Sequence, residues 1–200
     1  MIDKFTNIYE TRRWGKDESD EFRGSSGKGS RVDQNINTYI PFLKKFINEN
    51  NIKTISDLGC GTFYCGETLY DDLDIIYNGY DAYEKVVNYN ANKYKTPKYN
   101  FKHIDVCADK EIIKGGDLCI LKDILQHWEG KYIYELLDYF VETKKYKYIL
   151  IINCCNQKTD DQELDKHSMR PLNCKYNPLK KYNATKIYKY SSKEVCLITL

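Results

Sequence analysis

The sequence has no hydrophobic run long enough to cross a lipid bilayer, and its start lacks the charged-then-apolar pattern of a secretory leader. From these absences we expect a soluble chain that resides in the cytoplasm. The eight cysteines form no Cys-x-x-Cys pair. The sequence therefore lacks the spacing of a zinc ribbon, and it is too long for a disulfide-rich secreted module. We predict reduced thiols and no metal site.

The chain also lacks a strong excess of charge of either sign. It has 31 Lys and Arg residues against 29 Asp and Glu residues, a formal net charge of +2, which by itself indicates no polyanionic partner. With 42% hydrophobic and 30% charged residues, the composition is that of a globular protein and excludes a disordered chain. A length of 200 residues suits one domain. We predict an N-terminal segment over 1–31 and one domain over 32–200.

The most informative stretch is Thr-Ile-Ser-Asp-Leu-Gly-Cys-Gly-Thr at residues 54–62. It predicts a short strand that reaches an acid, Asp57, and then a turn at Gly59 and Gly61. Glycines let the backbone turn sharply and approach a ligand closely, and ligands of open α/β sheets bind outside the carboxyl ends of the strands. A dinucleotide fingerprint needs a third glycine where Tyr64 stands, so a nicotinamide cofactor fits poorly.

Two further predicted strands also end in an acid. The strand over 75–80 is followed by Asp81, and the strand over 99–104 is followed by Asp105. A carboxylate about twenty residues past a glycine turn suits a ribose diol, because it can accept hydrogen bonds from both hydroxyls. A single acid of this kind is often only a helix cap. The repetition of acids at three strand ends is more specific, and it favours ribose binding by Asp81.

The remaining pattern predicts an α/β protein with a doubly wound sheet. Apolar residues at helical spacing predict helices over 33–47 and 131–143. The stretch over 67–73 suits only a short helix, and a helix over 84–95 is closed by Thr96 and Pro97. Ser30 and Asp33 suggest a capping box at the first of these helices, in which Pro41 marks a kink or a restart. Further strands are predicted over 117–121, 146–154, 186–190 and 194–200. The last two must form an antiparallel hairpin, because a parallel connection needs a dozen or more residues.

The glycine turn resembles motif I of class I S-adenosylmethionine-dependent methyltransferases, whose pattern is acid-x-Gly-x-Gly-x-Gly. Phe63 stands in place of the last glycine of that motif. The terminal hairpin is similar to the end of the family's Rossmann-like, seven-stranded sheet. The resemblance implies that fold and S-adenosylmethionine as cofactor. The cofactor-binding residues it implies are Trp14, Ser26, Gly27, Asp57, Gly59, Cys60, Gly61, Asp81, Ala82, Asp105, Val106 and Lys122.

Residues 1–31 look polar and loop-like, with a charged run over 16–21. The run Ser-Gly-Lys-Gly-Ser at 26–30 has the composition of a linker. It also resembles a loop that precedes the domain in several small class I methyltransferases and folds over the cofactor. Trp14 and Phe22 favour such a lid, because no core pattern surrounds these two aromatic residues. Two interpretations of residues 1–31 are therefore kept, a lid over the cofactor and a flexible tail.

Candidate catalytic residues follow the strand predicted over 117–121. In an α/β sheet the next segment faces the substrate, and in the resembling family it closes the active site. His127 lies there, and a neutral imidazole can take a proton from a hydroxyl near neutral pH. Asp123 is the second candidate, as a group that positions the acceptor. A histidine that only packs and hydrogen-bonds at a helix start is the alternative for His127.

Candidate substrate residues lie in the loop after the strand predicted over 146–154. They are Asp160, His167 and Arg170, whose guanidinium suits a phosphate or a carboxylate. A solvated surface loop is the alternative, since acids such as Asp160 are common there.

For the acceptor we expect a small-molecule or glycan hydroxyl. The stretch from Lys166 to Lys193 holds eight Lys and Arg residues and no acid, so RNA or cap methylation is an alternative. A third possibility is a methyltransferase-like binding module without catalysis. The sequence does not indicate the oligomeric state.

Overall fold

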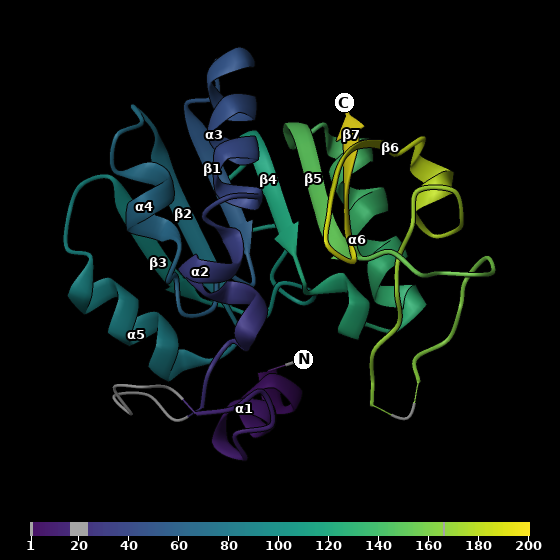
Figure 1. The fold of residues 1–200 in the computed structure, drawn as a ribbon, viewed down its shortest axis with the longest axis horizontal. Helices are drawn as coiled ribbons and strands as arrows, with labels where there is room; N and C mark the ends of the chain where they lie inside the picture. Colours follow the sequence, from purple (N-terminus) through teal and green to yellow (C-terminus); the bar gives the residue numbers. More distant parts are fainter. Residues whose placement is uncertain (1, 17–23, 166) are drawn as a thin grey trace. The chain divides into compact units, whose positions relative to one another are not determined.

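The structure of the chain is a computed structural model that describes residues 2–16, 24–165 and 167–200 (Figure 1). Phe22, most of the charged run over 16–21, and Lys166 lie outside these described residues. The seven strands form one mixed sheet in the order β3-β2-β1-β4-β5-β7-β6. The predicted doubly wound sheet with a terminal hairpin is thereby confirmed. Within the described ranges, no helix is long and apolar enough to span a membrane.

The chain divides into two compact units. The first comprises Met1–Ile55 and Gly59–Ile113, and the second comprises Ser56–Leu58 and Lys114–Leu200. The first unit contains α1 (Ile2–Glu10), η1 (Lys28–Ser30), α2 (Val32–Asn35), α3 (Tyr39–Glu49), the start of β1 (Thr54–Leu58), α4 (Gly66–Tyr70), β2 (Ile76–Asp81), α5 (Glu84–Lys93) and β3 (Tyr99–His103). The second contains the end of β1 with β4 (Gly116–Lys122), η2 (Leu125–His127), α6 (Gly130–Thr143), β5 (Tyr146–Cys154), η3 (Leu179–Tyr182), β6 (Thr185–Tyr190) and β7 (Lys193–Thr199).

In the second unit, β4 and β5 run parallel and β5 pairs with β7 in antiparallel register, Leu150 opposite Leu197. β6 and β7 form the hairpin predicted from connection length, drawn in yellow in Figure 1. Strand β5 is a nearly continuous apolar run because both of its faces are buried. The apolar stripe of α6, which includes Leu137 and Phe140, is buried as the helical spacing predicts.

The prediction that residues 1–31 are loop-like is wrong for the start of the chain, which forms α1. Phe5, Ile8 and Tyr9 lie at helical spacing, and Ile8 and Tyr9 are buried. Helix formation there depends on burying this short apolar face, because a helix of nine residues is marginal by itself. The loop interpretation overlooked this spacing among the polar residues around it.

The predicted capping box at Ser30 is also wrong. Helix α2 has Arg31 at its N-cap with no side-chain cap bond, and the Ser30 hydroxyl donates to the carbonyl of Gly27 at 2.7 Å. The predicted restart is confirmed, because α2 ends at Asn35 and α3 begins at Tyr39. Pro41 thereby falls in the first turn of α3, where its missing N–H breaks no helical hydrogen bond.

Phe63, which replaces the third glycine of the motif, has the left-handed backbone that glycine favours, with φ of 54°. Such a conformation is strained for a bulky residue. The ring is buried against Tyr77 at 4.7 Å, Tyr94 at 5.0 Å and Phe101 at 5.1 Å between ring centroids. A Cβ on Gly66 would lie 2.1 Å from this ring, so only glycine fits there. The aromatic packing offsets the backbone strain and keeps the turn in shape.

Candidate functional site

The glycine turn in the first unit is held by the acid at the end of β2. Gly59 and Gly61 have φ of 78° and 54°, and the N–H of Gly59 donates to the carbonyl of Tyr80 at 2.7 Å. The carboxylate of Asp81 accepts one bond from the N–H of Gly61 and another from the N–H of Tyr83, both at 2.9 Å. The structure thus brings Asp81 to the turn, as the sequence led us to expect.

The Asp81 carboxyl is 7% exposed. Burial raises its pKa, while the bonds from the N–H groups of Tyr83 and Gly61 oppose that rise. Each carboxylate oxygen has two lone-pair directions and accepts one of these backbone bonds, so each retains a direction for a ligand hydroxyl. This geometry fits a ribose diol.

Asn90 on α5 also fixes the turn, and sequence reasoning missed it. Its amide N–H donates to the carbonyl of Gly61 at 2.8 Å. Its Oδ1 and the hydroxyl of Thr62 are buried without a hydrogen-bond partner among the described residues. One sequence signal could have identified Asn90: it is a polar residue at a position where the spacing of the predicted helix over 84–95 calls for an apolar one. Two buried polar atoms without a partner among the described residues, both on residues of the glycine turn or bonded to it, are consistent with a site that takes a polar ligand.

Ser26, a predicted lid residue, lies directly on the glycine turn. Its Oγ accepts a bond from the N–H of Thr62 at 2.9 Å and lies 2.6 Å from the hydroxyl of Tyr9. A Cβ on Gly61 would lie 2.4 Å from this Oγ, so the close approach requires glycine.

Tyr9 on α1 joins this contact from the N-terminal segment. Its ring stacks on Tyr83 at 4.4 Å and meets Trp14 edge-on at 5.8 Å. Burial and then the negative charge of Asp81 raise the pKa of Tyr9 well above its usual value, so its hydroxyl stays protonated. Sequence reasoning missed Tyr9 because it assigned the segment to a loop.

Replacing Tyr9 by phenylalanine is expected to loosen the contact between Ser26 and the turn while keeping the stack on Tyr83. Loss of one neutral hydrogen bond costs about 1 kcal/mol, so exchange of the Thr62 amide hydrogen should become roughly fivefold faster. Hydrogen exchange followed by NMR measures this. Tyr83→Phe is the matched control, because the Tyr83 hydroxyl donates to Glu10 instead. Equal exchange of Thr62 in wild type and Tyr9→Phe would contradict the assignment.

The other predicted cofactor residues of the first unit have local partners. Asp105 accepts a bond from the N–H of Cys107 at 3.0 Å, as an acid that caps its own turn does. Val106 is buried, and the carbonyl of Ala82 lies 3.1 Å from Nε2 of His103. Gly27, next to Ser26, has φ of 82°. The side chain of Cys60 packs against Gly79 of β2, because a Cβ added to Gly79 would lie only 3.0 Å from the Cys60 Sγ.

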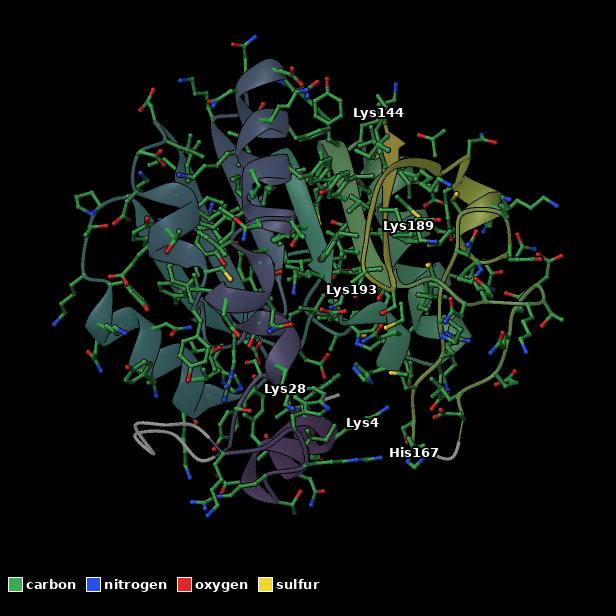
Figure 2. The ribbon with its side chains drawn as sticks, viewed as in Figure 1. Lys4, Lys28, Lys144, His167, Lys189 and Lys193 are labelled. Atoms are coloured by element: carbon green, nitrogen blue, oxygen red, sulfur yellow. The ribbon has the colours of Figure 1, made fainter. Side chains whose placement is uncertain are left out.

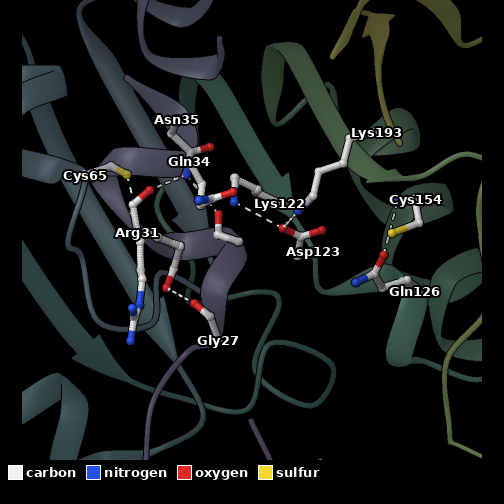
Figure 3. A network of polar contacts seen from close by, with 12 residues as sticks. Gly27, Arg31, Gln34, Asn35, Cys65, Lys122, Asp123, Gln126, Cys154 and Lys193 are labelled. Atoms are coloured by element: carbon white, nitrogen blue, oxygen red, sulfur yellow. Dashed lines mark hydrogen bonds and ion pairs between the residues drawn. The ribbon is translucent and has the colours of Figure 1, made fainter. Parts of the chain in front are cut away.

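The second unit contains an ion cluster at the carboxyl end of β4. Asp123 has φ of 62°, and its Oδ2 accepts bonds from Lys122 at 3.1 Å and from Lys193 (Figure 3). Its Oδ1 is buried without a hydrogen-bond partner in the part of the chain that the structure describes. Sequence reasoning missed Lys193, which it placed in the turn between the last two strands.

The charges of this cluster interact strongly. Burial raises the pKa of Asp123, but the two ammonium groups outweigh burial and hold that pKa below its usual value. Burial, and then the second cation Lys122, lower the pKa of Lys193. Two cations on one carboxylate leave a net positive charge near the end of β4.

Asp57, a predicted cofactor residue, belongs to the second unit and is half-buried. Its negative charge adds to burial in raising the pKa of Cys119.

Replacing Asp123 by asparagine is expected to lower the free energy of unfolding by about 2 kcal/mol, since two half-buried cations then lack their counter-charge. Asparagine tolerates the left-handed backbone. The lowered pKa of Asp123 means that the pair stabilises the fold above about pH 4 and loses this effect as the pH falls further.

Urea denaturation between pH 3 and pH 7 measures the effect of Asp123→Asn. The variant should lose the part of the acid-range dependence that Asp123 contributes, and Lys193→Met in the same chain should restore part of the lost stability. Unchanged stability of Asp123→Asn at pH 7 would show that the cluster is fully solvated.

His127 lies in η2, and its tautomer follows from its contacts. Its Nδ1 is 3.2 Å from the carbonyl of Ser168, which can only accept, so Nδ1 carries the proton and Nε2 keeps its lone pair. The side chain of Gln126 lies 3.5 Å from that Nε2. The Gln126 side chain is oriented by the N–H of Cys154, which donates to the Oε1 of Gln126 at 3.2 Å (Figure 3). A histidine held in this way can accept a proton at Nε2.

The predicted substrate residues lie in the segment after β5. Arg170 is 2% exposed, and its guanidinium donates to the carbonyls of Gln162 at 3.0 Å and Trp128 at 2.6 Å. This burial favours a structural role, because the two nitrogens that would fork onto a substrate already bind backbone. Asp160 accepts from the N–H of Asn177 at 2.7 Å, and His167 is exposed at the tip of the loop (Figure 2).

No family model matches the sequence, and no curated protein matches it. Solved structures match the fold. The methyltransferase domain of bacterial CtHen1-C superimposes with a TM-score of 0.60 at 14% identity, over 80% of this chain and 96% of that one. The PH0226 protein from Pyrococcus horikoshii OT3 gives a TM-score of 0.61 at 15% identity, over 84% of this chain and 90% of that one.

The mitomycin 7-O-methyltransferase MmcR gives a TM-score of 0.56 at 11% identity, over 76% of this chain. The present chain spans half of that protein's length, since 50% of MmcR is covered. Together these likenesses establish the fold: the chain adopts the class I S-adenosylmethionine-dependent methyltransferase fold.

Proposed function

We propose that the chain is a cytoplasmic methyltransferase that uses S-adenosylmethionine and methylates a hydroxyl oxygen of a small molecule or sugar. The observation that carries the proposal is the Gly59–Gly61 turn joined to Asp81 within a class I methyltransferase fold. The fold alone does not establish activity, because the same architecture hosts binding modules.

Residues of the first unit would hold the cofactor. Asp81 accepts the ribose hydroxyls, and the glycine backbone allows the close approach that Cβ atoms would block. Asp105 and Val106 would contact adenine, and Ser26 would cover the turn. When bound, S-adenosylmethionine supplies a methyl group made electrophilic by its sulfonium.

Residues of the second unit would handle the acceptor. His127 takes the hydroxyl proton at Nε2 while its Nδ1–H stays bonded to the carbonyl of Ser168, which stabilises the resulting imidazolium. The proton then leaves to water. Asp123 with its two lysines positions a polar acceptor, and one of them, Lys122, is also a predicted cofactor-binding residue. Most of the rate enhancement would come from holding donor and acceptor in line.

The choice of a small hydroxyl acceptor is supported by the similarity to a solved O-methyltransferase that acts on mitomycin and by the near-neutral charge. RNA is the second candidate, because Lys175, Lys180, Lys186 and Lys189 are exposed on the C-terminal third. An RNA substrate predicts affinity that falls steeply with salt, whereas binding of a neutral sugar should change little.

Calorimetric titration with S-adenosylmethionine, S-adenosylhomocysteine and NAD tests the proposal. We expect micromolar binding of the first two and none of NAD. Methyl transfer to a panel of sugars and phenols, and to short RNA at low and high salt, then separates the two acceptor classes. Absence of binding to either sulfur compound would favour a non-catalytic module.

A further inference from the structure

Three potential metal ligands meet in the second unit, far along the chain from the glycine turn. Cys174 comes from the long segment between β5 and β6, whereas Glu194 and Cys196 lie on β7. The two sulfurs and one carboxylate oxygen all lie within 4.8 Å of one another. Glu194 and Cys196 are two residues apart on a strand, so their side chains point to the same face of the sheet.

Glu194 is a buried acid that has no cationic partner among the residues that the structure describes. Its side chain is 4% exposed, and its Oε1 accepts only weak contacts, from the N–H of Cys174 at 3.3 Å and the thiol of Cys196 at 3.4 Å. Across the described ranges, no lysine, arginine or histidine forms an ion pair with it. Asp123, by contrast, has two lysines. A buried carboxylate is costly unless a cation or several donors compensate it.

Asn153 provides an independent observation at the same place. It lies opposite Glu194 in the register of β5 and β7, so both side chains share one face of the sheet. Asn153 is 1% exposed, and neither its amide oxygen nor its amide nitrogen has a hydrogen-bond partner among the described residues. An unpartnered buried amide beside an uncompensated buried acid indicates that a ligand completes this site.

We propose that Cys174, Glu194 and Cys196 bind a zinc ion, with Asn153 or a water held by it at the fourth position. Two sulfurs and one carboxylate oxygen suit zinc and disfavour magnesium and calcium, which prefer oxygen ligands. Tetrahedral zinc with sulfur ligands at about 2.3 Å needs the two sulfurs about 3.8 Å apart, which small side-chain rotations provide. On binding, each thiol releases its proton to water and donates a sulfur electron pair to the ion.

The site has a structural consequence for the loop that carries candidate acceptor residues. A zinc ion would tie Cys174, within the segment between β5 and β6, to strand β7, which lies between β5 and β6 in the sheet. That segment also supplies the Ser168 carbonyl that orients His127. The zinc site does not depend on methyltransferase activity. The proposed site also departs from our sequence prediction of no metal site. Glu194 and Cys196 follow Cys174 by 20 and 22 residues, and this spacing forms no recognisable metal-binding motif.

The test is the zinc content of the purified chain after equilibration with zinc and desalting under a reducing phosphine. We expect about one zinc per chain in wild type, as for other structural sites, and little in Cys174→Ala or Glu194→Gln. Cys119→Ala is the matched control, because that buried cysteine of β4 lies outside the cluster, and it should retain zinc. Circular dichroism verifies that each variant folds.

Cobalt substitution and thermal melting add two readouts. Cobalt should give an intense near-ultraviolet sulfur-to-metal band in wild type and Cys119→Ala, weakened in Cys196→Ala. Saturating zinc should raise Tm by roughly 5 to 10 °C, and a chelator should reverse the rise. Wild-type zinc content equal to that of folded Cys174→Ala, with no change of Tm, would overturn the proposal. The function proposed above would be unaffected.

Discussion

Replacing Asp81 by alanine is expected to weaken binding of S-adenosylmethionine by about a hundredfold or more. In the function we propose, the carboxylate beside the glycine turn accepts both ribose hydroxyls, and hydrogen bonds to a charged group are each worth about 1.5–3 kcal/mol. Losing two of them costs at least about 3 kcal/mol, and every 1.4 kcal/mol is a factor of ten in affinity. Calorimetric titration measures the change directly.

Asp81 also accepts bonds from the backbone of Gly61 and Tyr83, so its removal can disturb the turn itself. Asp81→Asn separates the two effects, because the amide keeps the size and one acceptor oxygen. It should bind the cofactor more weakly than wild type and melt closer to wild type than Asp81→Ala does. Asp72→Asn, an exposed acid paired with Lys44, is the matched control and should bind normally. Wild-type affinity in a folded Asp81→Ala variant would show that the cofactor binds elsewhere.

Replacing His127 by alanine is expected to lower kcat about a hundredfold with a hydroxyl acceptor, while cofactor affinity stays within twofold of wild type. General-base catalysis by a positioned side chain contributes 10²–10⁴-fold, and the contact of Nδ1 with the Ser168 carbonyl leaves the proton-accepting lone pair of His127 on Nε2. The acceptor is whichever sugar or phenol the screen identifies, and the rate is followed as S-adenosylhomocysteine released.

Two further measurements separate catalysis from folding at His127. The wild-type rate should fall as the pH drops through the titration of the imidazole, and His127→Ala should lose that dependence. Added imidazole should restore part of the rate of the variant, which a purely structural defect would not allow. Normal turnover in His127→Ala would assign the residue to packing. An amine acceptor would also abolish the effect, because an amine is already nucleophilic.

The long elements were predictable from the sequence because local patterns specify them. Strand β5 reads as an unbroken apolar run, and α6 carries its apolar residues at helical spacing. Helix α1 was missed because its short apolar face is stabilised by packing, through the stack of Tyr9 on Tyr83, rather than by a long local pattern. Phe63 could not be assessed either, since the aromatic rings that offset its backbone strain come from distant positions.

By itself, the sequence determined the fold class, the glycine turn, the acids that end strands and the terminal hairpin. Periodicity, glycine positions and connection length are local properties that the chain carries in any conformation. Only the tertiary structure decided which side chains meet: Tyr9 and Ser26 at the turn, Lys193 on Asp123, and Cys174 beside Glu194. These partners are 17 to 70 residues apart, and no pattern within a chain records contacts that arise only when strands and loops pack together.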